Sequence, residues 1–414
     1  MTNYSLFLYI ADCFLLAWFY FLFFARNKGL SPAFLFFPIW SLTVYLFYYK
    51  LENQLYLYDL MAMVDGSGTI KVIVPFAIAS VAGFVFGDIL VSPRKTELDM
   101  SIIAQDADRI YHKLFFFLYL AAFLGLVRFA ISGISVIDLI EIRARYVALY
   151  RENNALFIWL NRLWSYSNFF TTFLLFALAV RSVYFKLDWK KNIPVLILYA
   201  IPSLLAGARN FLSVIFLYYI IPICFFTYLQ EKSIKKTLVR QKNVVLLILL
   251  GTILFIIFGI FRNDTSKEIS MESFRTKLFY VSDGLAFTDY IVSSGDARNH
   301  AFDLSPLFSM SGREKYAQGT LETGMQDYIP SILPDLYYVW GDYFGIYWFF
   351  FSFLLQFISL KLRMSQDFSK QLLFFIICSL SFQTAGGNSF GTIYAWLLFW
   401  FILNRIPQSK IIEE

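Results

Sequence analysis

The chain has 414 residues, of which 59% are hydrophobic, 21% are aromatic and 15% are charged. A soluble globular domain carries about a quarter charged residues, so this composition excludes an ordinary soluble domain. The net charge of +6 needs no nucleic acid to explain it, because the basic residues sit between apolar runs, where a membrane protein carries them. We predict an all-α polytopic membrane protein in which residues 1–414 form a single integral membrane domain.

Apolar runs recur from one end of the chain to the other and predict about eleven transmembrane segments. The segments cover residues 4–25, 33–50, 70–90, 112–132, 156–180, 193–207, 211–229, 243–261, 337–360, 371–384 and 389–403. The sixth and the tenth are short. At about 1.5 Å per residue, 193–207 gives roughly 22 Å of helix, less than a hydrocarbon core of about 30 Å. We therefore predict two short, broken helices.

The first span, 4–25, follows no basic segment and precedes no small-residue cleavage site, so we expect a retained anchor. All three cysteines of the chain lie in apolar spans. This position predicts burial as small hydrophobic side chains, not a disulfide or a metal site. The three are Cys13, Cys224 and Cys378.

Basic residues cluster on alternate connections between the spans, and that side is predicted to be the cytoplasm. The clusters lie at 26–28, 181–191, 232–242 and 361–363. The N-terminus is then outside and the C-terminus inside. Three features follow on the outside: an acidic loop at 51–69, an amphipathic helix in the membrane interface at 133–155, and a large loop at 262–336. The large loop is too long for a mere connection, and we expect it to be functional.

Four arginines depart from the charge pattern, because they lie at the outer ends of the predicted spans. They are Arg128, Arg162, Arg209 and Arg262. An arginine in hydrocarbon is costly unless it is paired or faces a polar cavity. Each can also snorkel to the outer headgroups, and this alternative stays open. Arg209 fits it least, because a helix that starts at Asn210 points free N–H groups and the positive end of its dipole outward, which favours phosphate.

The tenth span ends in a break that is similar to the one at Arg209. AGARNF at 206–211 and AGGNSF at 385–390 share small residues, an asparagine and an aromatic residue. Small residues also serve close helix packing, and that alternative stays open. Two breaks that both open outward predict a shared cavity.

Three motifs follow one another over residues 193–400. A short span ends in Gly-x-Arg, GIFRND places an arginine just outside the membrane, and the large outer loop ends in PDLYYVWGDYFG. The residues that carry the motifs are Gly207, Arg209, Arg262, Asp335, Tyr337, Trp340 and Gly341. In this order they resemble the Wzy-type polymerases of O-antigen and other oligosaccharide repeat units, which are lipid-carrier-dependent glycosyltransferases of the GT-C class.

The resemblance implies a multi-pass protein of the bacterial inner membrane that acts in lipopolysaccharide biosynthesis. Its implied substrate is an undecaprenyl-pyrophosphate-linked oligosaccharide. The growing glycan passes from undecaprenyl pyrophosphate to a sugar hydroxyl of an incoming lipid-linked unit, on the outer face of the membrane. The implied enzyme is a metal-independent glycosyltransferase that needs no cofactor and no nucleotide. Membrane lipid and a chain-length regulator protein are the further partners.

The resemblance also implies roles for single residues. Arginines stabilise charge that develops on the leaving pyrophosphate, and those expected to bind it are Arg209, Arg262, Arg128 and Arg162. A carboxylate or histidine takes the hydroxyl proton, and the candidates are Asp335 and His300, followed by Asp283 and Glu322. The residues expected to contact the glycan are Asn210, Tyr337, Trp340 and Asn388. Plainer alternatives stay open, since a loop histidine is often solvated, Asp335 can cap the ninth span, and tyrosine and tryptophan are common at membrane interfaces.

Asp106-Ala-Asp108 has the spacing of the metal-binding carboxylate pair of nucleotide-sugar transferases. It lies on the cytoplasmic side among mixed charges, so we expect a solvated loop and no metal there. Two other functions stay open. An O-antigen ligase differs only in its acceptor. A flippase or other transporter of the lipid-linked oligosaccharide needs polar residues through both leaflets, where the sequence offers only Asp12 and Asp88, and it leaves the large outer loop unexplained.

Overall fold

A computed structural model of the chain describes most of the predicted membrane segments. The described residues are 3–53, 65–92, 98–133, 145–146, 148–149, 152, 154–187, 189–205, 210–232, 236–237, 282–295, 332–385 and 401. Within these ranges the structure is helical with connecting turns, and seven helices are long and apolar enough to cross a membrane. The chain therefore has the character of a helical membrane protein. The predicted span 243–261, the predicted span 389–403 except Phe401, and most of the loop 262–336 lie outside the described residues.

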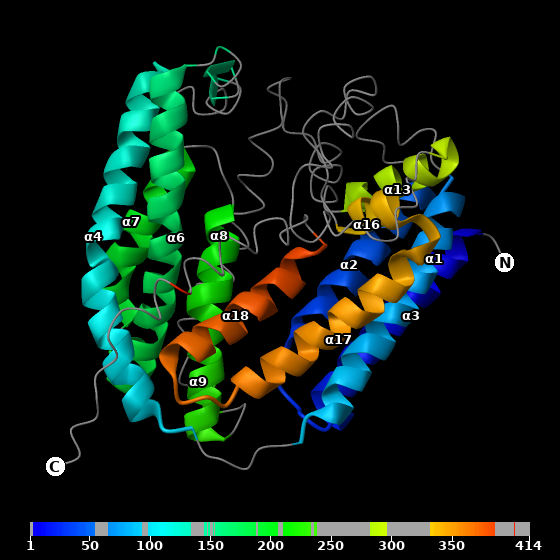
Figure 1. The fold of residues 1–414 in the computed structure, drawn as a ribbon, viewed down its shortest axis with the longest axis horizontal. Helices are drawn as coiled ribbons and strands as arrows, with labels where there is room; N and C mark the ends of the chain where they lie inside the picture. The colour runs from blue at the N-terminus through cyan, green and yellow to red at the C-terminus, as the bar shows by residue number, and fades with distance from the viewer. Residues whose placement is uncertain are drawn as a thin grey trace. The chain divides into compact units, whose positions relative to one another are not determined.

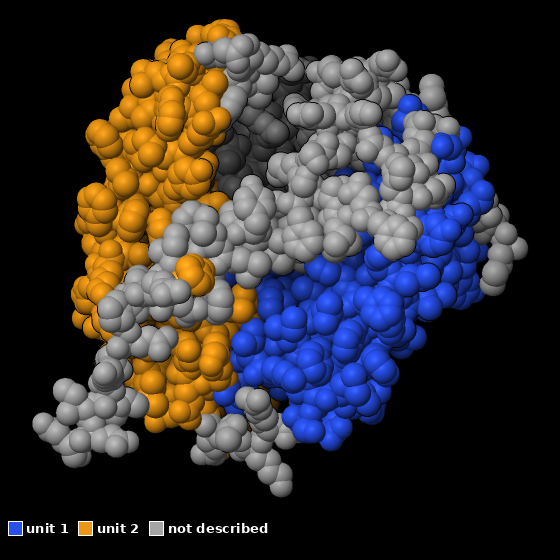
Figure 2. All heavy atoms as spheres, in the orientation of Figure 1, with its two compact units in different colours: residues 1–96, 270–364, 376–398 blue, residues 97–269, 365–375, 399–414 orange. Residues whose placement is uncertain are grey.

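The chain divides into two compact units, which Figure 2 colours separately. Unit 1 comprises residues 1–96, 270–364 and 376–398, and unit 2 comprises residues 97–269, 365–375 and 399–414.

Unit 1 is built around four long helices that lie side by side (Figure 1). They are α1 (Asn3–Phe19), which continues as the π-helical turn η1 (Tyr20–Phe24), α2 (Pro32–Glu52), α3 (Ser67–Leu90) and α17 (Phe344–Leu362). Glycines let α3 approach α17 closely. A Cβ atom at Gly83 would collide with Ser352 Oγ, and one at Gly87 would lie 2.8 Å from Gln356 Cβ. Small residues at such crossings are typical of helix packing in membranes.

Buried aromatic rings fill the centre of unit 1. The rings of Trp40 and Phe76 lie 4.6 Å apart, and those of Phe76 and Trp348 lie 5.0 Å apart. All three side chains are fully buried. Helices α2, α3 and α17 therefore meet at the level of Phe76. At 1.5 Å per residue, this level is about 18 Å along α3 from Asp88, near the end of the helix.

Asp88 organises one end of unit 1, which we call the Asp88 end. Its side chain is fully buried, and its carboxylate accepts hydrogen bonds from the backbone N–H groups of Arg26 at 2.8 Å and Asn27 at 3.1 Å. Asn27 donates in return to the carbonyls of Asp88 and Val91. The guanidinium of Arg363 donates to the carbonyl of Asn27. One carboxylate thus ties the turn after α1 to the ends of α3 and α17.

We expect Asp88→Ala to destabilise the protein, because it leaves the buried N–H of Asn27 and the partly buried N–H of Arg26 without their acceptor, at a cost of about 1–3 kcal/mol for the buried group. Asp88→Asn keeps one acceptor oxygen and should cost less. Thermal unfolding of the purified protein in detergent measures both effects. The control is Asp99→Ala, since Asp99 makes a similar bond to Ser101 N–H at 2.8 Å on an exposed turn. Equal melting temperatures for Asp88→Ala and Asp99→Ala would contradict the assignment.

Unit 2 contains an antiparallel pair, α4 (Met100–Ser132) and α6 (Ala155–Tyr184). Helix α7 (Ile193–Leu205), which follows the short 3-10 turn η4 (Trp189–Asn192), packs on α4 (Figure 1). At this contact a Cβ atom at Gly125 would collide with the ring of Pro202. A further span consists of α8 (Asn210–Ile215), the π-helical turn η5 (Phe216–Ile220) and α9 (Ile221–Glu231). With 13 residues, α7 is short, as the sequence predicts.

The prediction for the start of α4 is wrong. The helix begins at Met100 and not at 112, and its 33 residues measure about 50 Å. Its first turns are amphipathic, with Ile103, Ala107 and Ile110 buried at helical spacing. Asp106 and Asp108 therefore lie on a helix and not in a solvated loop. Each has a basic partner. Arg109 Nη2 lies 3.3 Å from Asp106 Oδ1, and Arg181 Nε lies 2.7 Å from Asp108 Oδ1.

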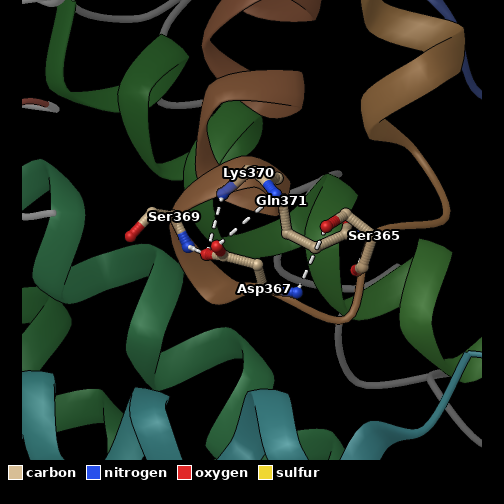
Figure 3. A network of polar contacts seen from close by, with 5 residues as sticks. All are labelled: Ser365, Asp367, Ser369, Lys370 and Gln371. Carbon is tan, nitrogen blue, oxygen red and sulfur yellow. Dashed lines mark hydrogen bonds and ion pairs between the residues drawn. The ribbon is translucent and has the colours of Figure 1, made fainter. Parts of the chain in front are cut away.

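Helix α18 (Phe368–Gln383) begins three residues earlier than predicted, because Asp367 caps its first turn (Figure 3). Asp367 Oδ1 accepts hydrogen bonds from the N–H groups of Ser369 at 2.8 Å and Lys370 at 3.3 Å. The Gln371 side chain donates to the carbonyl of Ser365 at 2.8 Å. Such bonds satisfy backbone donors that have no partner within the helix.

The three cysteines differ in exposure. Cys378 is buried and Cys224 is partly buried, but Cys13 is exposed. The prediction of burial is therefore wrong for Cys13. The helical periodicity of α1 places Cys13 on the same face as Leu16, which is 67% exposed, and away from the buried Phe14.

Candidate functional site

Two helix ends meet inside unit 1. The backbone N–H of Ile332, the first residue of α16 (Ile332–Trp340), donates to the carbonyl of Thr384 at 2.9 Å, just after the end of α18. The indole N–H of Trp40 donates to Thr384 Oγ1 at 2.8 Å. Trp40 lies in the middle of α2, about 12 Å from its first residue and about 18 Å from its last. Helix α18 therefore ends level with the interior of a neighbouring span, and not at its end.

Asp335 lies in the first turn of α16 and is only 7% exposed. It is inside the helix, so the alternative in which Asp335 precedes and caps the ninth span is wrong. Helix α16 continues through the 3-10 turn η7 (Gly341–Tyr343) into α17, and the span that the sequence places at 337–360 begins at Ile332. A carboxylate is thus held among helices of unit 1, beside the meeting point of α16 and α18.

The two aromatic residues of the motif are both engaged within unit 1. Tyr337 is partly buried, packs against Phe287, and lies 5.9 Å from the ring of Phe344. Trp340 is fully buried and stacks on Tyr347 with 4.5 Å between ring centroids. A sugar could reach part of Tyr337, whereas Trp340 would have to leave its position to stack on a ligand.

The second break of the sequence begins beside Asp335. Thr384 is four residues before Asn388, which lies outside the described residues, and Ile332 is three residues before Asp335. The bond between Ile332 and Thr384 brings these two stretches together. Sequence reasoning paired the break at 385–390 with the one at 206–211 but not with Asp335. Nothing in the local pattern of either stretch indicates a single bond across more than fifty residues.

Helix α13 (Asp283–Ser294) comes from the segment predicted as the large loop, and it caps α3. The carboxylate of Asp289, 2% exposed, accepts a hydrogen bond from the N–H of Thr69 at 2.8 Å. Thr69 Oγ1 donates to the carbonyl of Leu285 at 2.8 Å. A Cβ atom at Gly68 would lie 3.0 Å from Asp289 Oδ1, so the contact requires a residue without a side chain. We call this end of unit 1 the Asp289 end.

The other face of α13 supports α16. Phe287 and Ile291 are buried and pack against Tyr337 and Tyr338. The cap on α3 therefore also fixes the helix that carries Asp335. The sequence around Asp289 gives no sign of this contact, because its partner Thr69 lies 220 residues away.

Burial raises the pKa of Asp289 above its ordinary value of 3.8, and the nearby carboxylate of Asp65 raises it further, against the hydrogen bond from Thr69. The native state then keeps the Asp289 proton to a higher pH than the unfolded chain does. In that window, just above 3.8, the stability of the native state rises as the pH falls. Asp289→Asn keeps an oxygen for Thr69 but does not titrate.

We therefore expect the melting temperature of the wild type to rise relative to that of Asp289→Asn as the pH is lowered from about 7 towards about 4. Asp99→Asn is the control, because Asp99 does not act on Asp289. Hydrogen bonds from Ser101 lower the pKa of Asp99, so its contribution is lost only below its ordinary range and the control should show no change between those two values. A constant difference between the wild type and Asp289→Asn would contradict the role of this carboxyl.

Two of the predicted outer arginines lie at one level of unit 2. Arg128 Cζ on α4 is 4.3 Å from the ring centroid of Trp164 on α6, two residues after Arg162. At the other end of the same helices Arg181 binds Asp108. Arg181 follows Arg162 by 19 positions on α6, which corresponds to about 28 Å of helix, close to a hydrocarbon thickness of about 30 Å. We call this level the Arg128 end of unit 2.

The two arginines differ in their surroundings. Arg128 is 4% exposed, and its guanidinium faces an aromatic cage, which consists of Tyr146 at 5.0 Å, Phe157 at 5.7 Å and Trp164 at 4.3 Å. Arg162 is exposed and lies 5.8 Å from the ring of Trp159. Its place beside an exposed tryptophan is typical of a residue at the membrane interface. The aromatic cage therefore gives the Arg128 guanidinium three cation–π contacts.

Tyr146 and Leu149 belong to the segment predicted as an interfacial helix. Residues 145–146 and 148–149 are helical, while 134–144 lie outside the described residues. Tyr146 and Leu149 are buried against Phe157, and Arg145 pairs with Glu152 at 3.1 Å on the exposed side. Arg128 thus holds this segment against the ends of α4 and α6.

The pair Arg128 and Arg162 offers a matched test. We expect Arg128→Gln to lower the free energy of unfolding by roughly 2–4 kcal/mol, because desolvated cation–π contacts are lost in the aromatic cage. Arg162→Gln, at an exposed site, should change it by less than about 0.5 kcal/mol. Thermal unfolding in detergent measures both. A normal melting temperature for Arg128→Gln would show that the aromatic cage is not its main role.

The remaining predicted residues are placed as follows. Asn210 is the first residue of α8, while Arg209, Arg262, His300 and Asn388 lie outside the described residues. Asp335, Tyr337 and Trp340 belong to unit 1, and Arg128 and Arg162 belong to unit 2. In the described part of the chain no three His, Cys, Asp or Glu side chains gather in a way that could hold a metal ion.

Comparison of the chain with protein-family models, with curated proteins and with solved structures finds no match. Functional assignment therefore rests on the residues and their geometry.

Proposed function

We propose that the chain polymerises lipid-linked oligosaccharide repeat units on the outer face of the bacterial inner membrane, as a metal-independent glycosyltransferase. The observation that carries the proposal is the buried Asp335, held in the first turn of α16 beside the end of α18. Burying a carboxylate within a membrane protein is costly, and such groups usually serve function. The motif around Asp335 is the one that resembles the Wzy-type polymerases.

The proposed reaction joins two lipid-linked substrates. A sugar hydroxyl of the incoming unit attacks the anomeric carbon of the growing glycan, and the bond from that carbon to the pyrophosphate oxygen breaks. Asp335 takes the hydroxyl proton as general base. The undecaprenyl pyrophosphate leaves with added negative charge, which arginines in a poorly hydrated site stabilise. Of these, Arg209 and Arg262 are the main candidates, because the aromatic cage already engages Arg128.

The proposal assigns an orientation to both units. The Asp289 end and the Arg128 end face outward, and the Asp88 end and Arg181 face the cytoplasm. The distribution of basic residues along the sequence supports this orientation. It places α13, from the large loop, outside the membrane, where it supports α16.

The geometry of Asp88 speaks against the transporter alternative. A flippase would need polar groups that are free to line a path, whereas the Asp88 carboxylate is taken up by backbone N–H groups of the neighbouring turn. The ligase alternative differs only in the acceptor, so the choice of acceptor in the assay separates it from the polymerase.

The test uses the purified full-length protein in nanodiscs with undecaprenyl-pyrophosphate repeat units as the only substrate. We expect long glycan on the lipid carrier, without nucleotide sugars and in the presence of EDTA. Asp335→Asn should abolish polymerisation at normal melting temperature. Arg209→Lys should impair it strongly and Arg209→Ala by about 10²–10³ in rate, because lysine keeps the charge but not the planar fork.

A full glycan ladder from Asp335→Asn or from Arg209→Gln at normal expression would contradict the assigned roles. Loss of activity on chelation, restored by manganese or magnesium, would contradict the metal-free mechanism. Transfer to lipid A core in place of a second repeat unit would identify a ligase.

A further inference from the structure

Helix α1 presents an acidic residue on a face that nothing in the described structure covers. Asp12 is exposed and makes no hydrogen bond or ion pair within the described part of the chain. Along the membrane-crossing segment Ser5–Phe24, it lies about 10 Å from the first residue and about 18 Å from the last. Asp12 is therefore inside the hydrocarbon layer, and its side chain is too short to reach either surface of the membrane.

The exposed face of α1 is a continuous stripe. Tyr9, Leu16 and Phe23 are 52%, 67% and 53% exposed, and Asp12 and Cys13 lie between them at helical spacing. Of the seven candidate spans α1 is the least buried, with 28% of its apolar window inside the structure. We call this face, with residues 9, 12, 13, 16 and 23, the α1 stripe.

Lipid does not suit the α1 stripe, because a carboxyl group in hydrocarbon is costly without a partner. Polar side chains in this position hold transmembrane helices together. A carboxyl in its neutral form is both donor and acceptor, so it is complementary to a second carboxyl. A pair of this kind needs at least one proton, since two carboxylates would repel each other.

A second copy of the chain supplies such a carboxyl group, because it carries its own Asp12. Two copies related by a twofold axis along the membrane normal present the same residue at the same depth. A different protein would have to carry its own polar group about 10 Å below the surface, at the same cost as Asp12. We propose that the α1 stripe is the contact between two copies of this chain, with the two Asp12 carboxyl groups hydrogen-bonded to each other.

Cys13 makes the proposal testable with the chain's own chemistry. In a variant with Cys224→Ala and Cys378→Ala, Cys13 is the sole cysteine. We expect copper-phenanthroline to cross-link it in native membranes to a disulfide-linked dimer on a non-reducing gel. The control adds Cys13→Ala and Ile78→Cys, which puts a sole cysteine at a position of the same unit that is 65% exposed. The control should stay monomeric.

Asp12 is tested in the same background. Asp12→Leu should reduce dimer formation about ten-fold, the size of a hydrogen bond between membrane helices, while Asp12→Asn, whose amide is also self-complementary, should retain it. Two epitope tags on co-expressed copies establish that both halves of the dimer are this chain. A dimer at 13 with both tags, absent at 78 and lost with Asp12→Leu, supports the proposal.

The other outcomes overturn it. They are no cross-link at Cys13, equal cross-linking at position 78, a cross-link that survives Asp12→Leu, or a product that contains another protein. The measurement needs no glycan substrate, so its result is independent of the proposed function.

Discussion

A backbone group inside hydrocarbon has no water to bind, and unit 1 satisfies its groups with partners from distant parts of the sequence. The bond from Ile332 N–H to the carbonyl of Thr384 is the one on which the candidate site depends. It gives the end of α18 and the start of α16 a partner each, and so permits two helices to stop within the thickness of the neighbouring spans. The carboxylate of Asp88 meets the same requirement at the other end of the unit.

Helix α16 is held from three sides by contacts of different kinds. Its first N–H is bound to Thr384, Phe287 and Ile291 of α13 pack against its tyrosines, and Trp340 at its end stacks on Tyr347. The scaffold therefore fixes the backbone at Asp335, which is the arrangement that a catalytic or binding group requires.

The long spans in the described part of the chain lie close to where the sequence predicts them, because an apolar run of about 20 residues is the length that a membrane-crossing helix requires. The ends of α2 and α6 differ from their predicted ends by a few residues. The predicted start of α4 is wrong, because residues 100–111 are amphipathic and too polar to be recognised by their hydropathy. The cap by Asp289 and the aromatic cage of Arg128 are not predictable from the sequence, since both join segments that only the folded chain brings together. The motif indicates Asp335, but it does not predict that this residue lies inside α16.

The cap on α3 has a consequence for the order in which the protein is made. Thr69 and Asp289 are separated by 220 residues, and at about 5–20 residues per second their synthesis is roughly 10–45 s apart. During this interval α3 must insert without the Asp289 carboxylate on its first turn, and the N–H groups of that turn have only water or lipid headgroups as partners. Completion of α3 therefore awaits the synthesis of α13, so a late segment of the chain takes part in the assembly of a helix that the ribosome finished long before.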